Sequence, residues 1–154
     1  MIQKLRERSR SESGFTLVEL LVVMLILGLL AAIAIPSFFN QRDKARDADA
    51  KSAARTAQTA IETYATDHGG EYLGADPAAL GAIEETLQEA VDEGRLTVPT
   101  ATADDYQVSV QSETEENTFS ILRTAGVVTY ECLTENNDGC PDGGDWSGDV
   151  EAAP

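Results

Sequence analysis

The segment that decides the fold is FTLVELLVVMLILGLLAAIAI, residues 15–35, which Pro36 follows at once. It carries a single charge, Glu19. About 20 apolar residues, each rising ~1.5 Å along a helix, match the ~30 Å hydrocarbon core of a bilayer. Four Lys and Arg side chains among residues 1–14 favour a cytoplasmic N-terminus. The segment therefore predicts a single membrane span, with the body of the protein outside the cytoplasm.

A secretory signal peptide is the alternative interpretation, because residues 32–34 read Ala-Ile-Ala, which fits a small-residue cleavage site. Two features count against it. The apolar run is long for the core of a signal peptide, and a helical pattern continues beyond Pro36. The alternative implies a different class of protein, a secreted or anchored binding domain.

Glu19 is the exceptional residue of the span. A carboxylate within a membrane costs about 2.5 kcal/mol or more, so it usually has a partner and a function. A position near enough to the interface to reach lipid headgroups is the simpler explanation.

Residues 14–19, GFTLVE, resemble the class III signal of type IV pilins and type II secretion pseudopilins. The resemblance covers residues 5–60 closely and the rest in layout. It implies that prepilin peptidase cuts between Gly14 and Phe15, removes the leader 1–14 and N-methylates the new Phe15 amine. It also implies that Glu19 pairs with the Phe15 amine of a neighbouring subunit, since docking supplies the buried carboxylate with a counter-charge.

Gly28 and Pro36 lie where that family commonly has helix-loosening residues, in the membrane or filament-core helix 15–36. The resemblance implies that residues 28–36 partly unwind in the filament. A tolerated kink in a membrane helix is the alternative.

Residues 37–68 predict an amphipathic continuation of the same helix, which Gly69 and Gly70 end. A helix over 15–68 is too long for a small domain, so one half should lie in membrane or filament and the other against a head domain. Charged residues just outside the membrane suggest a solvated belt, with salt bridges between subunits as the alternative. The belt comprises Asp43, Lys44, Arg46, Asp47, Asp49 and Lys51, and Arg55, Gln58 and Glu62 continue the polar side of the helix.

Residues 69–154 predict a small α+β head packed on the long helix. Asp76 and Pro77 suit the start of an extra helix over 77–93. Short alternating segments between about residues 105 and 132 predict an antiparallel meander of three strands.

Cys132 and Cys140 predict a disulfide, because the topology places them in an oxidising compartment. The family resemblance agrees, since many pilins close a C-terminal loop in this way. Two thiols without a nearby His do not complete a zinc site. The loop 132–140 should therefore be covalently closed.

The C-terminal tail is rich in Asp, Asn and Gly, and two interpretations remain open. One is a solvated acidic tail. The other is a calcium site, since oxygen ligands on a glycine-rich backbone suit Ca²⁺ and since major pseudopilins bind calcium in this region. The EF-hand pattern fits incompletely, and no other cofactor is expected. The candidate calcium ligands are Asn136, Asp138, Asp142 and Asp145.

Charge and motif content point to a structural protein. The chain has 11 Lys and Arg against 27 Asp and Glu, a net charge of −16, so direct nucleic-acid binding by the head is not expected. His68 is the only histidine, and no nucleophile elbow or phosphate-binding loop is present, which argues against an enzyme.

The resemblance is closest to a major type IV pilin, with a type II secretion pseudopilin or a minor pilin as the alternatives. The expected partners are copies of the chain, prepilin peptidase, and a membrane assembly platform with its ATPase. The expected location is the cytoplasmic membrane as a single-pass prepilin, and then an extracellular surface filament.

Overall fold

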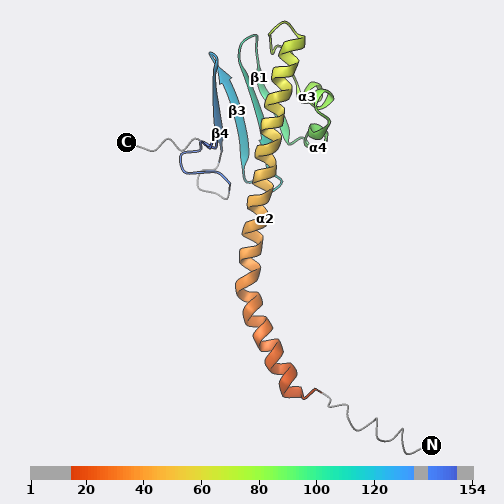
Figure 1. Cartoon of the computed structure of the whole chain (residues 1–154), viewed down its shortest axis with the longest axis vertical. Coiled ribbons are helices and arrows are strands. Elements are labelled where there is room, and N and C mark those ends of the chain that lie inside the picture. The colour runs from red at the N-terminus through yellow and green to blue at the C-terminus, as the bar shows by residue number, and fades with distance from the viewer. Residues whose placement is uncertain (1–14, 134–138, 149–154) are drawn as a thin grey trace, which may run out of the picture. The chain divides into compact units, whose positions relative to one another are not determined.

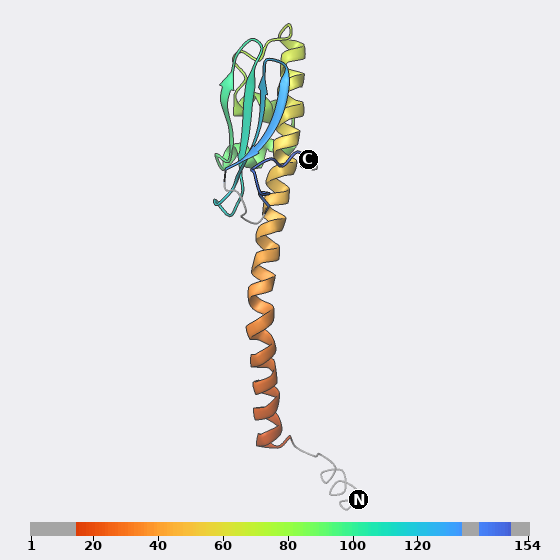
Figure 2. The same ribbon diagram turned by 90° about the vertical axis from the view of Figure 1, so that its left-hand side faces the viewer.

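The computed structural model describes residues 15–133 and 139–148 (Figure 1). The chain divides into two compact units, Met1–Phe39 and Asn40–Pro154, and helix α2, Leu17–Asp67, runs through both. Within the second unit, the C-terminal part of α2 lies beside an antiparallel sheet in both ribbon views (Figures 1 and 2). This arrangement confirms the predicted α+β fold.

In the first unit, α2 is a continuous helix with an exposed apolar surface. Pro36 lies inside the helix, and the helix also continues through Gly28. The described side chains from Phe15 to Phe39 are almost all exposed. The expected unwinding of residues 28–36 concerns the assembled filament and stays a prediction.

The C-terminal end of α2 follows from two glycines. Gly69 and Gly70 have φ angles of 74° and 95°, in the left-handed region that glycine adopts without strain. The Gly70 amide donates to the Ala65 carbonyl at 2.8 Å, which satisfies an orphan acceptor of the last turn. The helix therefore ends at Asp67, one residue before the predicted boundary at His68.

The segment after this turn differs from the predicted single helix over 77–93. The structure has α3 (Pro77–Ile83), the 3₁₀ turn η1 (Glu85–Leu87) and α4 (Gln88–Asp92). Glu84 is extended between α3 and η1, with φ −129° and ψ 100°. Gly81 lies at the close approach of α3 and α4, where a Cβ would lie 3.2 Å from the Val91 side chain. Two short helices packed on each other thus bury Leu80, Leu87 and Ala90 of the apolar stripe that suggested one helix, while Ile83 stays exposed.

The predicted cap of this segment is present. The Asp76 side chain accepts a 2.8 Å hydrogen bond from the Ala79 amide, and Pro77 occupies the first turn. Proline is tolerated there because the first amides of a helix have no intrahelical acceptor.

The sheet has four strands in the order β1-β2-β3-β4, with antiparallel neighbours. They are β1 (Leu96–Ala101), β2 (Tyr106–Gln111), β3 (Thr118–Thr124) and β4 (Val127–Cys132). The meander is as predicted, but β1 is additional. The sequence of β1 does not indicate a strand, because Pro99 has no amide hydrogen to donate to a neighbouring strand. The strand lies at the sheet edge, and its pairing with β2 is irregular between Thr97 and Thr100, so Pro99 fits.

The core lies between α2 and the inner face of the sheet. Small side chains on α2 let the sheet approach closely, and Ala54, Ala57 and Ile61 are fully buried. The opposing layer comes from alternate positions of β2 and β3, as expected for strands with one covered face. Its fully buried members are Tyr106, Val108, Val110, Phe119 and Ile121.

Candidate assembly site and the polar seam

The first functional element is the start of α2, where Thr16 and Glu19 form a capping box. Glu19 Oε2 accepts hydrogen bonds from the Thr16 amide and the Thr16 hydroxyl, both at 3.1 Å. The Glu19 amide donates to Thr16 Oγ1 at 3.2 Å. Reciprocal bonds of this kind satisfy two orphan amides of the first turn. The carboxylate predicted to act between subunits therefore also has a role within its own chain, which the sequence analysis missed although T-x-x-E is a known signature.

Phe15, the residue predicted to follow the cleavage point, lies just before this cap. Its side chain is 82% exposed, so nothing in the described chain covers it. Gly14, on the other side of the predicted cleavage point, lies outside the described residues. The predicted pairing of Glu19 with a neighbouring Phe15 amine is a contact between copies and stays a prediction.

The surface that follows is apolar on all sides. Leu25 is 73% exposed, and its apolar neighbours along the first unit are similarly exposed. Among the described residues, one helix, α2, is long and apolar enough to cross a membrane. A contiguous exposed surface of this kind calls for lipid or protein around it.

The second element is a polar seam, which we define as Lys51, Arg55, Gln58 and Glu62. The spacing i, i+4, i+7, i+11 places these residues on one face of α2. Lys51 was expected in the solvated belt, but the seam packs against the sheet and the C-terminal loop, with Lys51, Gln58 and Glu62 half-buried. Each seam residue contacts an aromatic side chain, Lys51 and Arg55 at the ring and Gln58 and Glu62 at a tyrosine hydroxyl.

The basic half of the seam contacts rings through cation–π interactions. Lys51 Nζ lies 5.1 Å from the centre of the Phe119 ring. The Arg55 guanidinium lies 5.1 Å from the Tyr130 ring and 5.2 Å from the Trp146 ring. Such contacts contribute about 0.5–2 kcal/mol each, depending on how far they are removed from water.

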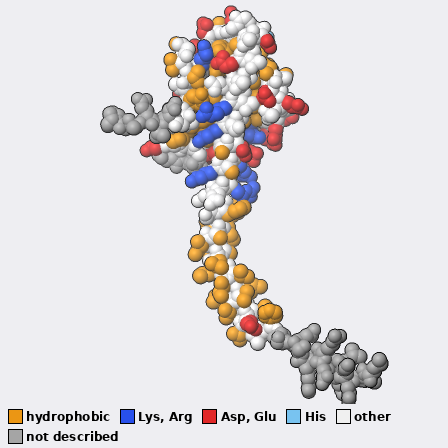
Figure 3. All heavy atoms as spheres, in the orientation of Figure 1, with side chains coloured by type: hydrophobic (Ala, Val, Ile, Leu, Met, Phe, Trp, Pro, Cys, Tyr) orange, Lys and Arg blue, Asp and Glu red, His pale blue; other side chains and the backbone are white. Residues whose placement is uncertain are grey.

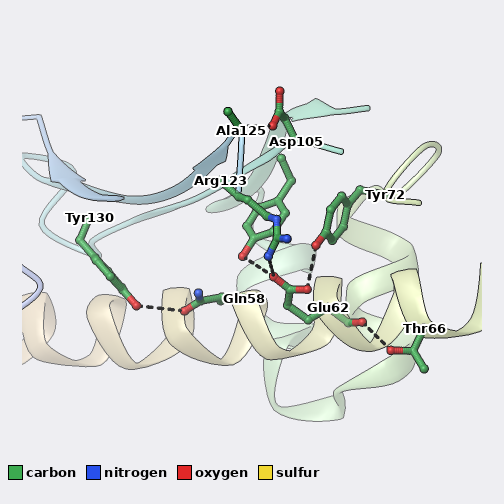
Figure 4. Close-up of polar contacts among 9 residues, drawn as sticks. Gln58, Glu62, Thr66, Tyr72, Asp105, Arg123, Ala125 and Tyr130 are labelled. Carbon is green, nitrogen blue, oxygen red and sulfur yellow. Dashed lines mark hydrogen bonds and ion pairs between the residues drawn. The ribbon is translucent and has the colours of Figure 1, made fainter. Parts of the chain in front are cut away.

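The acidic end of the seam is Glu62, which joins three segments (Figure 4). Its carboxylate accepts hydrogen bonds from the Tyr72 hydroxyl at 2.8 Å and from the Tyr106 hydroxyl at 3.0 Å. Arg123 of β3 forms an ion pair with it at 3.4 Å. Burial, followed by the contact with Glu62, raises the pKa of the Tyr72 hydroxyl. Burial is also the main cause of a raised Tyr106 pKa.

Asp47, expected in a solvated belt, is buried and anchors the C-terminal loop. Its side chain is 1% exposed. Its Oδ2 accepts from the Asn117 side-chain amide at 2.6 Å and from the Gly139 amide at 2.9 Å. A Cβ at Gly139 would lie 2.6 Å from Asp47 Cβ, so only glycine permits this approach. The Lys51 ammonium donates to the carbonyl of the same residue, Gly139, so α2 holds both backbone groups of this glycine.

The predicted disulfide between Cys132 and Cys140 is confirmed, with Cα atoms 5.8 Å apart. The loop returns to its own strand beyond the bridge. The Cys132 amide donates to the Gly144 carbonyl at 2.8 Å, and the Trp146 indole donates to the Glu131 carbonyl at 2.9 Å. Trp146 is 4% exposed, so the tail closes the core rather than extending into solvent at this point.

The proposed calcium ligands fall partly outside the described chain. Asn136 and Asp138 lie there, whereas Asp142 and Asp145 are described. The Asp145 side chain accepts a 2.8 Å hydrogen bond from the Ser147 amide. The Asp145 backbone forms an isolated antiparallel β-bridge with Glu131 of β4. Within the described ranges, no group of three His, Cys, Asp or Glu side chains is placed to hold a metal ion. The calcium site stays a prediction.

Comparison with known proteins places these features in a family. Residues 9–35 match the family model described as the prokaryotic N-terminal methylation motif, and they include Gly14, Phe15 and Glu19. Prepilin peptidase-dependent protein D of Escherichia coli is 33% identical over 98 residues, which cover 53% of this chain and 67% of that protein. The chain belongs to the type IV pilin and pseudopilin family.

Two further relatives mark the breadth of this pilin family. Type II secretion system core protein G of Pseudomonas aeruginosa is 39% identical over 59 residues, which cover 38% of this pilin-family chain and 42% of the relative. The type IV major pilin protein PilE of Neisseria gonorrhoeae is 27% identical over 123 residues, covering 79% and 74% respectively. The chain thus spans less than half the length of the secretion-system relative. No solved structure gives a significant match.

Proposed function

We propose that the chain is the major subunit of a type IV pilus and assembles through its N-terminal helix. The observation that carries this proposal is the exposed apolar surface of α2 in the first unit, which follows a cleavage motif and a capped glutamate. An exposed apolar surface of this size is stable only when lipid or neighbouring copies of the chain cover it. A filament core of packed helices supplies the second environment.

The proposed assembly begins with cleavage between Gly14 and Phe15 and methylation of the new Phe15 amine. The Glu19 carboxylate then faces two sets of donors, the Thr16 cap of its own chain and the cationic amine of a neighbour. In a medium of low dielectric constant the charged partner is favoured, because an unpaired buried carboxylate is costly. Glu19 thereby draws the subunit from the membrane into the filament and sets the axial step.

We assign no enzymatic role to the chain. The energy to extract the subunit from the membrane would come from an assembly platform and its ATPase. Prepilin peptidase would act on the chain as its substrate. The subunit would reside in the cytoplasmic membrane before assembly and on the cell surface afterwards. The acidic head should bind no nucleic acid directly, because its net charge repels phosphate.

The likeness to the major pilin extends over 123 residues, against 59 for the secretion protein, which favours a pilin. The docked disulfide loop points the same way. A type II secretion pseudopilin is the second candidate, because the higher identity, 39%, is to core protein G. A minor pilin would share the same helix and processing at lower abundance.

Mass spectrometry of sheared surface filaments tests the proposal. We expect this chain to be the most abundant protein, beginning at N-methylated Phe15. A chain that begins near residue 35 would instead support an ordinary signal peptide. Presence at trace abundance would support a minor pilin, and retention in the envelope with loss of a secreted protein on deletion would support the pseudopilin.

A further inference from the structure

One face of the second unit carries an exposed cation without an ion-pair partner in the described chain. This is Arg42, near the start of the unit. Its neighbour one turn on, Arg46, is already engaged, at 4.0 Å from Asp43 and 3.5 Å from Glu113. Lys44 is also exposed, but two residues correspond to about 200° of helical rotation, so it lies on the opposite side of α2.

The same face carries exposed anions on the α3–η1–α4 segment. Glu85 and Glu89 are exposed, and neither has an ion-pair partner within residues 15–133 or 139–148. They are four residues apart and of like charge, a mutually unfavourable arrangement. Figure 3 shows acidic side chains gathered over α3 and α4, and basic side chains on the part of α2 that precedes them.

The acidic segment adjoins the stripe of α2 that carries Arg42. A groove between α2 and η1 is lined by Ala53 and Thr56 of the helix and by Thr86 and Leu87 of the acidic segment. Ala53 follows Arg42 by eleven residues, about three full turns, so both positions share a face. The patches are therefore displaced along the helix by about 16 Å, at ~1.5 Å per residue.

We propose that Arg42 of one copy docks against Glu85 and Glu89 of a second copy that is displaced along the direction of α2. The inference rests on the proposed filament function and names the surfaces that meet. A second copy in the same orientation, displaced along α2, meets the acidic pair with its Arg42 and leaves its own acidic pair for a third copy, so the contact is heterologous. Heterologous contacts that do not close extend without limit, as a filament requires.

Charge singles out a second copy as the partner. A chain with a net charge of −16 repels another copy unless the contact brings opposite charges together. The net charge also repels nucleic acid, and Arg42 is a single exposed cation on its face, too few to hold an anionic membrane surface.

Charge exchange in the full-length chain tests the contact in filaments. We expect Arg42→Glu to reduce the yield of surface filaments about tenfold, since it sets like charges opposite one another. Glu85→Arg with Glu89→Arg should cause a similar loss, and the triple exchange should restore most of the yield. Lys44→Glu is the matched control and should assemble normally. Normal assembly of Arg42→Glu, or no recovery in the triple exchange, would overturn the proposal.

Cross-linking tests the same contact without relying on filaments. The variant with Arg42→Cys and Glu89→Cys should form disulfide-linked dimers and longer ladders in membranes, whereas Lys44→Cys with Glu89→Cys should not. If the wild-type chain is absent from surface filaments, the proposed pilus function is refuted. The cross-link still reports whether the Arg42 and Glu89 faces of two copies meet. No product from the Arg42 and Glu89 pair, or equal product from both pairs, would refute the docking.

Discussion

Glu19 serves the helix start through hydrogen bonds and, in the proposed function, assembly through charge. Glu19→Gln separates the two, because an amide oxygen can still accept from Thr16 while the negative charge is lost. We expect Glu19→Gln to be processed normally but to form few surface filaments, as Glu19→Ala should. Filament yield and the mass of the membrane-anchored chain are the measurements. Wild-type yield from Glu19→Gln would show that the charge is not required.

Asp47 is the residue on which the C-terminal loop depends. Asp47→Ala should lower the free energy of unfolding by about 3 kcal/mol, because the Gly139 and Asn117 donors lose their buried acceptor. Denaturant unfolding followed by the fluorescence of Trp146, the only tryptophan, measures the change. Asp49→Ala, at an exposed site on the same helix, is the control and should change little. Equal stability of both variants would contradict the anchoring role.

At the scale of elements, the contact of α2 with the sheet through Glu62 should depend on pH. Burial and Glu62 raise the pKa of Tyr72, and burial raises that of Tyr106, so the folded state favours the protonated phenols. The stabilisation is complete below about pH 10, the ordinary tyrosine pKa, and is lost as the pH rises through the folded-state pKa values.

The expected result is a falling unfolding temperature above about pH 10, with a smaller slope in the double variant Tyr72→Phe/Tyr106→Phe. Thermal unfolding followed by circular dichroism measures it. Tyr130→Phe, whose hydroxyl contacts Gln58 at 3.5 Å instead, is the control. An unchanged slope in the double variant would refute the role of these two phenols.

The disulfide constrains a short loop, and its removal should have a moderate cost. For nine residues, Cys132 to Cys140 inclusive, chain entropy gives about 2.6 kcal/mol. Cys132→Ser/Cys140→Ser should therefore unfold at lower denaturant concentration with the head still folded, because Asp47 and Trp146 also hold the loop. Loss of the native circular dichroism spectrum at zero denaturant would show that the bridge is indispensable.

Sequence reasoning located the elements whose signals are local. Turn residues indicated the end of α2 just before Gly69 and the cap at Asp76. The alternation of apolar and polar residues indicated the hairpin strands. Strand β1 was not indicated, because Pro99 masks an edge strand whose pairing is set by the neighbour. The break at Glu84 was not expected, because no Gly or Pro marks it and α3 and α4 pack against each other only in the folded chain.

The candidate site divides in the same way. The motif around Glu19 is contiguous in the sequence, so it could be recognised without the structure. Asp47, by contrast, became buried only because Asn117 and Gly139, far along the chain, fold against it. The polar seam had a visible signal, four polar residues at helical spacing, but its aromatic partners come from the sheet and the tail.

For the whole molecule, the division into two units predicts a separable soluble body. All residues of the buried core lie in the second unit, whereas the exposed apolar side chains of α2 lie in the first. A chain that begins at residue 40 should fold and remain monomeric without detergent, and the full chain should require it. Analytical ultracentrifugation and circular dichroism test this. Aggregation of the shortened chain would show that the first unit stabilises the second.

The bond between Asp47 and Gly139 joins residues 92 positions apart. A contact of such high sequence separation forms late, since the intervening chain must be ordered first. During synthesis, therefore, the Asp47 carboxylate remains hydrated until Asn117 and then Gly139 have emerged and folded against it. Translation products that stop before Gly139 cannot form this contact, so Asp47 does not anchor a C-terminal loop in them.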